Sequence, residues 1–142
     1  MIIKQLSVFV ENRRGKVTEI MEALASEGID IRALSLADTN EFGLLRMIVS
    51  KPDAAYALLR EAGMMVRLSD VVAVGVLDKM GEFSKATRII AEAGVDLEYL
   101  YALASRRDDE AVIIMRLDQP GEAISALREG GFRIVDPKEI YK

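Results

Sequence analysis

The sequence repeats itself, and this repeat restricts the possible folds more than any other feature of the chain. A shift of 66 positions places Gly15 on Gly81, and further along a shift of 68 positions places Pro52 on Pro120. Glycines and prolines that recur in the same order indicate two copies of one structural unit. Other matched pairs are Ala25 and Ala91, Gly28 and Gly94, Asp30 and Asp96, and the segments 59–63 and 127–131.

Each copy has the same succession of strand and helix patterns. Val17, Ile20 and Leu24 have the spacing of one helix face, and Gly28 follows them as glycine typically follows a helix. Proline favours the first turn of a helix, so Pro52 predicts the start of a second one. Apolar, β-branched runs predict strands at 3–10, 29–37, 42–49 and 64–68, and in the second copy at 71–77, 95–103, 111–117 and 132–135.

The order β-α-β-β-α-β in each copy is that of a ferredoxin-like unit. We therefore expect an α+β protein with two such domains side by side, residues 1–70 and 71–142. Right-handed crossovers put both helices of a unit on one face of an antiparallel sheet. Leu34, Leu36 and Leu100 give the second strands apolar edges, which invite pairing. We expect these two strands to pair and to join the copies into one eight-stranded antiparallel sheet with helices on one face.

Composition argues against several classes of function. The chain has no cysteine and no histidine, so thiolate sites and the commonest general base are absent. No GxSxG, P-loop or GxGxxG pattern occurs, and we expect neither enzymatic activity nor a cofactor. A net charge of −4 without a basic tract argues against nucleic-acid binding. No apolar run reaches the roughly 18 residues of a membrane span, and no signal segment opens the sequence. We expect a cytoplasmic protein.

One segment carries a family resemblance. Val10-Glu11-Asn12-Arg13-Arg14-Gly15, followed by a helix, a glycine and Ile29-Asp30-Ile31, resembles the ACT domain. The second copy is similar through Asp78-Lys79-Met80-Gly81 and Gly94-Val95-Asp96-Leu97. The resemblance covers nearly the whole chain. It implies a stand-alone tandem ACT protein, a regulatory module that binds amino acids or similar small effectors.

The resemblance also implies where ligands bind. In the family they usually lie between two domains, held by the loop after the first strand of one and the start of the second strand of the other. The implied contacts are Asn12, Arg13, Arg14 and Gly15 with Asp30, Ile31, Asp96 or Leu97, and Asp78, Lys79, Met80 and Gly81 with the opposite strand. Arg14 and Met80 stand where the family often has proline, and Asp78 replaces the amide of Asn12. We therefore expect unequal affinities at the two sites.

Elementary chemistry supports such a site but also allows simpler roles. A helix that begins at Gly15 favours a carboxylate at its N-terminus, Arg13 or Arg14 can add a charge-assisted contact, and Asp30 or Asp96 can accept an ammonium group. Alternatively, Asn12 caps a turn, the arginines are solvated and the aspartates end a glycine turn. The acidic run Asp108-Asp109-Glu110 is interpreted as a solvated turn and not as a metal site.

These observations lead to a functional hypothesis with one alternative. The chain is expected to be an amino-acid-sensing regulator with effector sites at the groove between its domains. It is also expected to be a homodimer and to act in trans on a metabolic enzyme, a transporter or a transcriptional regulator. The alternative is a protein–protein interaction module without a ligand, which recruits partners through its edge strands.

Overall fold

The computed structural model describes residues 1–38, 41–103 and 108–142, which form seven strands and five helices. No helix in this described part of the chain has the length and apolar character needed to span a bilayer. In chain order the elements are β1 (Ile3–Glu11), α1 (Lys16–Ser26), β2 (Ile31–Asp38), β3 (Phe42–Val49), α2 (Pro52–Glu61), β4 (Met65–Leu77), α3 (Glu82–Glu92), β5 (Leu97–Ala102), β6 (Glu110–Leu117), α4 (Pro120–Glu129), β7 (Arg133–Ile134) and α5 (Pro137–Tyr141).

The chain divides into two compact units. The first unit consists of Lys4–Ser69 together with Tyr141–Lys142, and the second consists of Asp70–Ile140 together with Met1–Ile3. Strand β4 is continuous over 13 residues, so its first part belongs to the first unit and its second part to the second.

Both units have the ferredoxin-like strand order that the sequence predicted. In the first unit the neighbouring strands are β2, β3, β1 and β4. In the second unit the corresponding order is β5, β6, β4 and β7. The registers are antiparallel, with Val8 opposite Leu45 in the first unit and Val74 between Ile113 and Ile134 in the second.

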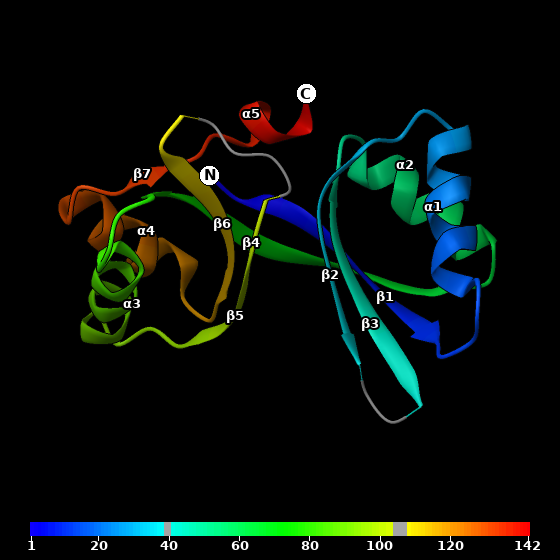
Figure 1. Ribbon diagram of the computed structural model, residues 1–142, viewed down its shortest axis with the longest axis horizontal. Coiled ribbons are helices and arrows are strands. Elements are labelled where there is room, and N and C mark those ends of the chain that lie inside the picture. Colours follow the sequence, from blue (N-terminus) through cyan, green and yellow to red (C-terminus); the bar gives the residue numbers. More distant parts are fainter. Residues whose placement is uncertain (39–40, 104–107) are drawn as a thin grey trace. The chain divides into compact units, whose positions relative to one another are not determined.

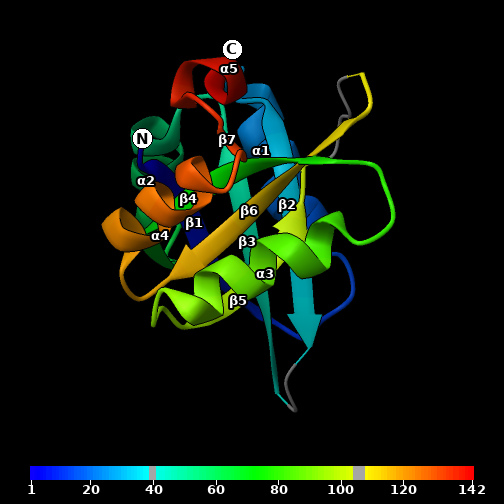
Figure 2. The same ribbon diagram turned by 90° about the vertical axis from the view of Figure 1, so that its left-hand side faces the viewer.

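The two helices of each unit's repeat cover one face of its sheet. Helices α1 and α2 lie on the same side of the first unit's strands, and α3 and α4 lie on the same side of the second unit's strands (Figures 1 and 2). Their apolar faces form the core: Ile20 and Leu24 of α1 and Leu59 of α2 are fully buried beside β1 and β3. In the second unit Ile90 of α3 and Leu127 of α4 are buried in the corresponding core. Burial of these faces stabilises each unit by roughly 1.5–3 kcal/mol per large side chain.

The sheet differs from the prediction in two respects. Eight strands were expected, but the predicted strands 64–68 and 71–77 are one strand, β4, and the described residues form seven. The reason is local: no glycine or proline separates Leu68 from Val71, so nothing forces a turn there. We also expected β2 to pair with β5. Instead, β2 pairs with β3 and β5 with β6, and the described residues include no ladder between β2 and β5.

Candidate functional site

The loop between β1 and α1 is held by its own backbone. The amide of Arg13 donates to the carbonyl of Glu11 at 2.7 Å, and the amide of Lys16 donates to the carbonyl of Arg13 at 3.2 Å. Gly15 is the N-cap of α1 with φ 84°, and no side chain caps the helix there. No atom lies within 4 Å of where a Cβ at Gly15 would be, so the left-handed backbone, and not crowding, explains the glycine.

The second copy has the same backbone hydrogen bonds in its loop between β4 and α3. Lys79 donates to the carbonyl of Leu77 at 2.8 Å and Glu82 donates to the carbonyl of Lys79 at 3.2 Å, while Gly81 caps α3 with φ 88°. Each bond is displaced from its counterpart by 66 positions, as the sequence repeat predicted. The side chains differ more than the backbone does, because Met80 is fully exposed and Asp78 stands in place of Asn12.

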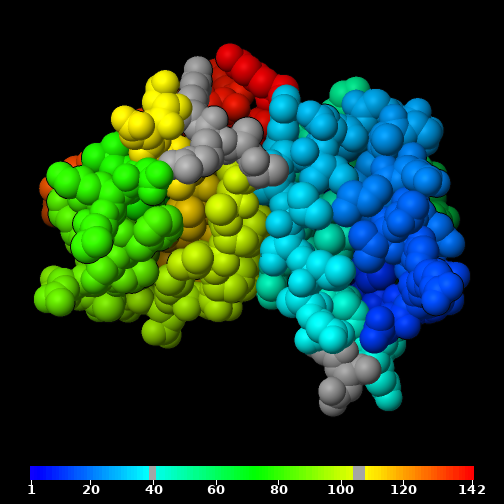
Figure 3. Space-filling model, in the orientation of Figure 1, coloured from blue at the N-terminus to red at the C-terminus, as the bar shows by residue number. Residues whose placement is uncertain are grey.

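A pocket of about 310 Å³ lies beside the loop of the first unit. The register of the sheet explains its position: Gly43 of β3 lies opposite Val10 of β1 and also opposite Asp38 of β2. The end of β2 is therefore brought next to the loop that follows β1, and blue and cyan atoms of these segments meet on the face drawn in Figure 3. The lining is apolar at Val10, Val17, Leu36, Ala37 and Gly43 and polar at Glu11, Asn12, Arg13 and Asp38.

The charges around this loop are partly paired. The Arg13 guanidinium lies 3.7 Å from the Glu11 carboxylate and 3.8 Å from the Glu19 carboxylate. Lys16 lies 3.4 Å from Glu19. Most of these side chains are about half exposed, so each pair contributes about 0–1 kcal/mol. Arg13 can therefore change partners at little cost when an anionic group enters the pocket.

The structure brings only some of the predicted first-loop residues together. Asn12 and Arg13 line the pocket, whereas Arg14 and Gly15 follow in the loop without lining it. Asp30 and Ile31 lie at the opposite end of β2 from Asp38, roughly 20 Å away along the strand. There the amide of Asp30 donates to Ser50 Oγ at 2.9 Å, and its carboxylate pairs with Arg32 at 3.1 Å. Within the first unit, Asp30 and Ile31 therefore do not belong to the pocket beside Asn12.

The predicted residues of the second copy have equivalent positions. Asp78, Lys79, Met80 and Gly81 form the loop before α3, and the amide of Asp78 donates to the carbonyl of Asp109 at 2.6 Å. Asp96 precedes β5, which begins at Leu97, and its amide donates to Asp118 Oδ1 at 2.8 Å. The proposed meeting of one copy's loop with the other copy's strand remains a prediction.

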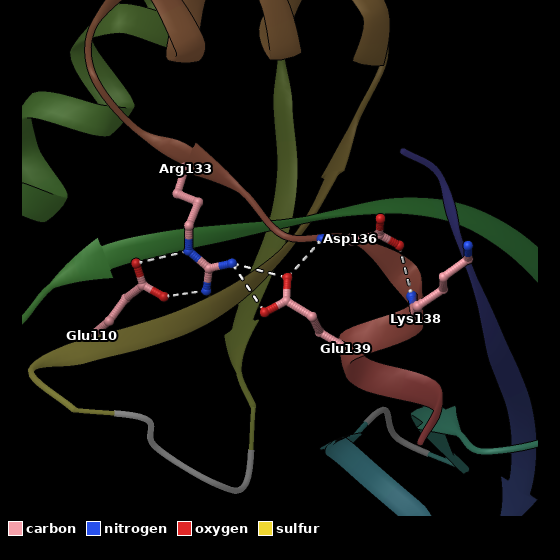
Figure 4. Close-up of polar contacts among 5 residues, drawn as sticks. All are labelled: Glu110, Arg133, Asp136, Lys138 and Glu139. Carbon is pink, nitrogen blue, oxygen red and sulfur yellow. Dashed lines mark hydrogen bonds and ion pairs between the residues drawn. The ribbon is translucent and has the colours of Figure 1, made fainter.

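The second unit contains a charged cluster that sequence reasoning missed. Arg133 of β7 donates through Nε and Nη2 to the Glu110 carboxylate and through Nη1 to the Glu139 carboxylate at 2.9 Å (Figure 4). The hydrogen bond with Glu110 is the largest cause that raises the pKa of the Arg133 guanidinium above its ordinary value, and partial burial opposes it. Glu110 was interpreted as part of a solvated turn, but its side chain is only 20% exposed. No sequence pattern joins positions 110, 133 and 139.

The cluster also lines a pocket of about 400 Å³ with Leu77, Asp108 and Asp109. Among the described residues that line this pocket the cation is Arg133, and its guanidinium already pairs with two carboxylates. In the described residues no group of three or more acidic side chains is arranged to hold a metal ion. The first unit's pocket is therefore the better candidate for a ligand site.

Comparison with known proteins identifies one family and several similar structures. The family model of the ACT domain pair matches residues 1–142. The crystal structure of a protein from Bacteroides thetaiotaomicron has 34% sequence identity and a TM-score of 0.92, covering 100% of this chain and 97% of that chain. No curated protein matches the sequence.

More distant structures have the same fold. The ligand-free regulatory subunit of aspartate kinase from Thermus thermophilus has 18% identity and a TM-score of 0.65, covering 89% of this chain and 91% of that chain. The corresponding subunit from Thermus flavus has 14% identity and a TM-score of 0.64, covering 91% and 94%. At these identities the similarity concerns the fold alone.

Proposed function

The chain belongs to the ACT domain pair family, and from this premise we propose that it is a regulatory protein that binds an amino acid or a similar small effector. The site we propose is the pocket of the first unit, where Asn12 and Arg13 stand beside an apolar wall. The predicted residues of the second loop, Asp78 to Gly81, form a second and weaker site in this proposal.

The observation that carries the proposal is the pocket at the β1–α1 loop. Its volume of about 310 Å³ is at the lower end for ligand pockets and suits a single amino acid better than a nucleotide. It combines an apolar wall with a guanidinium, an amide and carboxylates, which are the groups that a zwitterion with a side chain requires. The backbone of α1 begins next to it at Gly15 and adds a favourable field for a carboxylate.

The proposal includes regulation in trans and no reaction. Two structures with the same fold are named as regulatory subunits of a kinase, which supports a regulatory role more than a catalytic one. We propose that the chain acts as a homodimer in the cytoplasm and controls a metabolic enzyme, a transporter or a transcriptional regulator.

One observation favours a second function. Leu34 and Leu36 of β2 are 44% and 55% exposed, and Leu100 of β5 is 42% exposed. Each lies on a strand with one partner among the ladders of the described residues. Such apolar edges can add a strand from a partner protein without any ligand.

The test is a thermal-shift screen of the full chain against the twenty amino acids, followed by calorimetric titration of each ligand that raises the melting temperature. A ligand present at 100 times its Kd stabilises the folded state by about 2.7 kcal/mol. The blocking variant is Val17→Phe, because the second copy has Phe83 at the equivalent position and the fold therefore accommodates it. The matched control is Arg14→Ala, which changes the same loop without changing the pocket lining.

We expect at least one amino acid to bind the wild type and the Arg14→Ala variant with similar affinity and to bind Val17→Phe at least tenfold more weakly. A flat screen, together with a specific complex that forms through β2 or β5, would favour the interaction module instead. Equal binding to all three proteins would place the effector elsewhere.

A further inference from the structure

We infer that the effector of the first unit's pocket is an amino acid with an uncharged aliphatic side chain, such as leucine, and that Asp38 accepts its ammonium group. This inference rests on the proposed function and makes it more specific. It depends on three properties of the pocket: its apolar wall, the Asp38 carboxylate, which has no ionic partner among the described residues, and the acidic character of its rim.

The wall is formed by aliphatic side chains on three elements. Val10 of β1 is 2% exposed and Val17 of α1 is partly buried, so both are fixed by the core. Leu36 of β2 is 55% exposed and projects into the same pocket. An aliphatic ligand side chain placed here would cover Leu36 and lose its own contact with water, which is the main source of affinity in small apolar sites.

Gly43 makes this wall possible. A Cβ at position 43 would lie 3.1 Å from Leu36 Cδ1, which is tighter than ordinary contact. Because glycine has no Cβ, the Leu36 side chain can lie beside position 43 and form one side of the pocket. The second copy has Ala111 at the equivalent position, so the two copies differ at the residue that shapes this wall.

One carboxylate of the rim, that of Asp38, has no ionic partner in the part of the chain that the structure describes. Glu11 lies 3.7 Å from Arg13, whose guanidinium also approaches Glu19. The Asp38 carboxylate makes no hydrogen bond or ion pair with any residue that the structure describes. An ammonium group beside Asp38 would make a charge-assisted contact, and Asn12 and Arg13 in the same lining remain for the carboxylate of the ligand.

The same geometry disfavours charged side chains. A carboxylate on the ligand's side chain would lie against the apolar wall, where it loses its hydration, and inside a rim that already carries the like charges of Glu11 and Asp38. A lysine or arginine side chain would place its cation against Val10, Val17 and Leu36, which offer no hydrogen bond. Alanine fits the rim but leaves the wall uncovered, so we expect it to bind more weakly than leucine.

The first experiment is calorimetric titration of the full chain with leucine, alanine, aspartate and lysine. We expect leucine to bind roughly tenfold or more tightly than alanine, as extra methylene groups in an apolar pocket require, and aspartate and lysine to bind more weakly still. Leu36→Ala should weaken leucine binding about tenfold and leave alanine binding nearly unchanged. Leu34→Ala is the matched control, because Leu34 lies on the same strand, is similarly exposed and does not line the pocket.

The second experiment tests Asp38 with a ligand that lacks the ammonium group. Wild type should bind leucine at least tenfold more tightly than 4-methylpentanoate, and Asp38→Asn should remove most of that difference while its melting temperature without ligand stays near that of the wild type. An unchanged preference for leucine in Asp38→Asn overturns the role of Asp38.

The outcomes separate this inference from the proposed function. Tight binding of aspartate or lysine in this pocket, with leucine silent, would overturn the aliphatic class and leave amino-acid sensing in place. Binding of no amino acid at all would overturn both.

Discussion

The Glu110 carboxylate of β6 lies over Gly75 of β4 in the second unit and occupies the position that a side chain at residue 75 would take. A Cβ there would collide with this carboxylate. Glu110 lies opposite Leu77 in the ladder and Gly75 lies opposite Val112, so the Glu110 side chain leans toward Val112 and covers the glycine. Arg133, which pairs with Gly75 from the other side, holds the carboxylate there (Figure 4). The ion pair between Glu110 and Arg133 thus requires a residue without a side chain at position 75.

We predict that Gly75→Ala lowers the free energy of unfolding by about 1 kcal/mol, because the added methyl group displaces Glu110 from Arg133. In a Glu110→Ala background the same change should raise it by up to about 0.5 kcal/mol, since alanine is then unhindered and glycine is a poor strand residue. Urea unfolding of the four proteins gives the coupling between the two sites. If the effects of the two substitutions on the free energy of unfolding were additive, the proposed steric conflict between positions 75 and 110 would be wrong.

The two copies differ on this face of the sheet even though their backbones repeat. Phe9, Phe42 and Met65 stand in the first unit where Gly75, Glu110 and Arg133 stand in the second. The apolar set is substantially exposed, with Met65 at 71%. The fold therefore accommodates either a charged or an apolar cluster at these positions.

Arg133 also fixes the C-terminal helix of the second unit. Glu139 accepts from Arg133 and from the amide of Asp136 at 3.2 Å, while the Asp136 carboxylate accepts from the amide of Lys138 at 2.9 Å (Figure 4). Glu139 therefore caps the helix as the glutamate of a capping box does, while the Asp136 carboxylate accepts from the amide of the second helical residue. Arg133 orients this glutamate.

We predict that Arg133→Met, which introduces the first copy's residue, lowers the free energy of unfolding by about 1 kcal/mol. Amide hydrogen exchange should accelerate at Lys138 and in α5 more than elsewhere, because the capping glutamate loses its anchor. Arg88→Met on the exposed part of α3 is the control and should stay within about 0.5 kcal/mol of the wild type. Uniform acceleration over the second unit would speak against a local role.

The sequence predicted the order of elements well because its signals are local. Helix periodicity around Ile20, the glycines at 15 and 81 and the prolines at 52 and 120 each act within one turn or loop. The sequence did not predict which residues line the pocket, because that depends on the strand register. Asp38 and Leu36 reach the pocket because Gly43 pairs with both neighbouring strands, and no spacing in the sequence gives that register. The family resemblance directed attention to Asp30, at the other end of β2.

Tyr141 gives the first unit a pH dependence at alkaline pH. Burial raises the pKa of its phenol above the ordinary 10.0, although the Lys4 amide, which donates to the phenol oxygen at 2.8 Å, acts in the opposite direction. The folded state thus favours the neutral phenol. Its contribution to stability is complete below about pH 10 and is lost as the pH rises through the higher pKa of the folded state.

We predict that Tyr141→Phe lowers the free energy of unfolding near neutral pH by about 1 kcal/mol through the lost hydrogen bond. Above about pH 10 the free energy of unfolding of this variant should decrease less steeply with pH than that of the wild type. Urea titrations at a series of pH values between about 8 and 11 test both effects. Tyr56→Phe is the control, because the phenol of Tyr56 contacts Arg60 on its own helix and its removal leaves Tyr141 in place. The same decline in Tyr141→Phe as in the wild type would assign the alkaline transition to other groups.

The two N-cap glycines allow a direct test of why the loops need them. Gly15 and Gly81 have φ of 84° and 88° and open space around the position of a Cβ, so substitution meets no steric neighbour and only backbone strain remains. We predict that Gly15→Ala and Gly81→Ala each lower the free energy of unfolding by about 1–2 kcal/mol. Gly121 in α4 also has open space but no positive φ, and Gly121→Ala should raise it by up to about 1 kcal/mol. If all three substitutions shifted thermal unfolding in the same direction, the left-handed conformation would not be what the loops require.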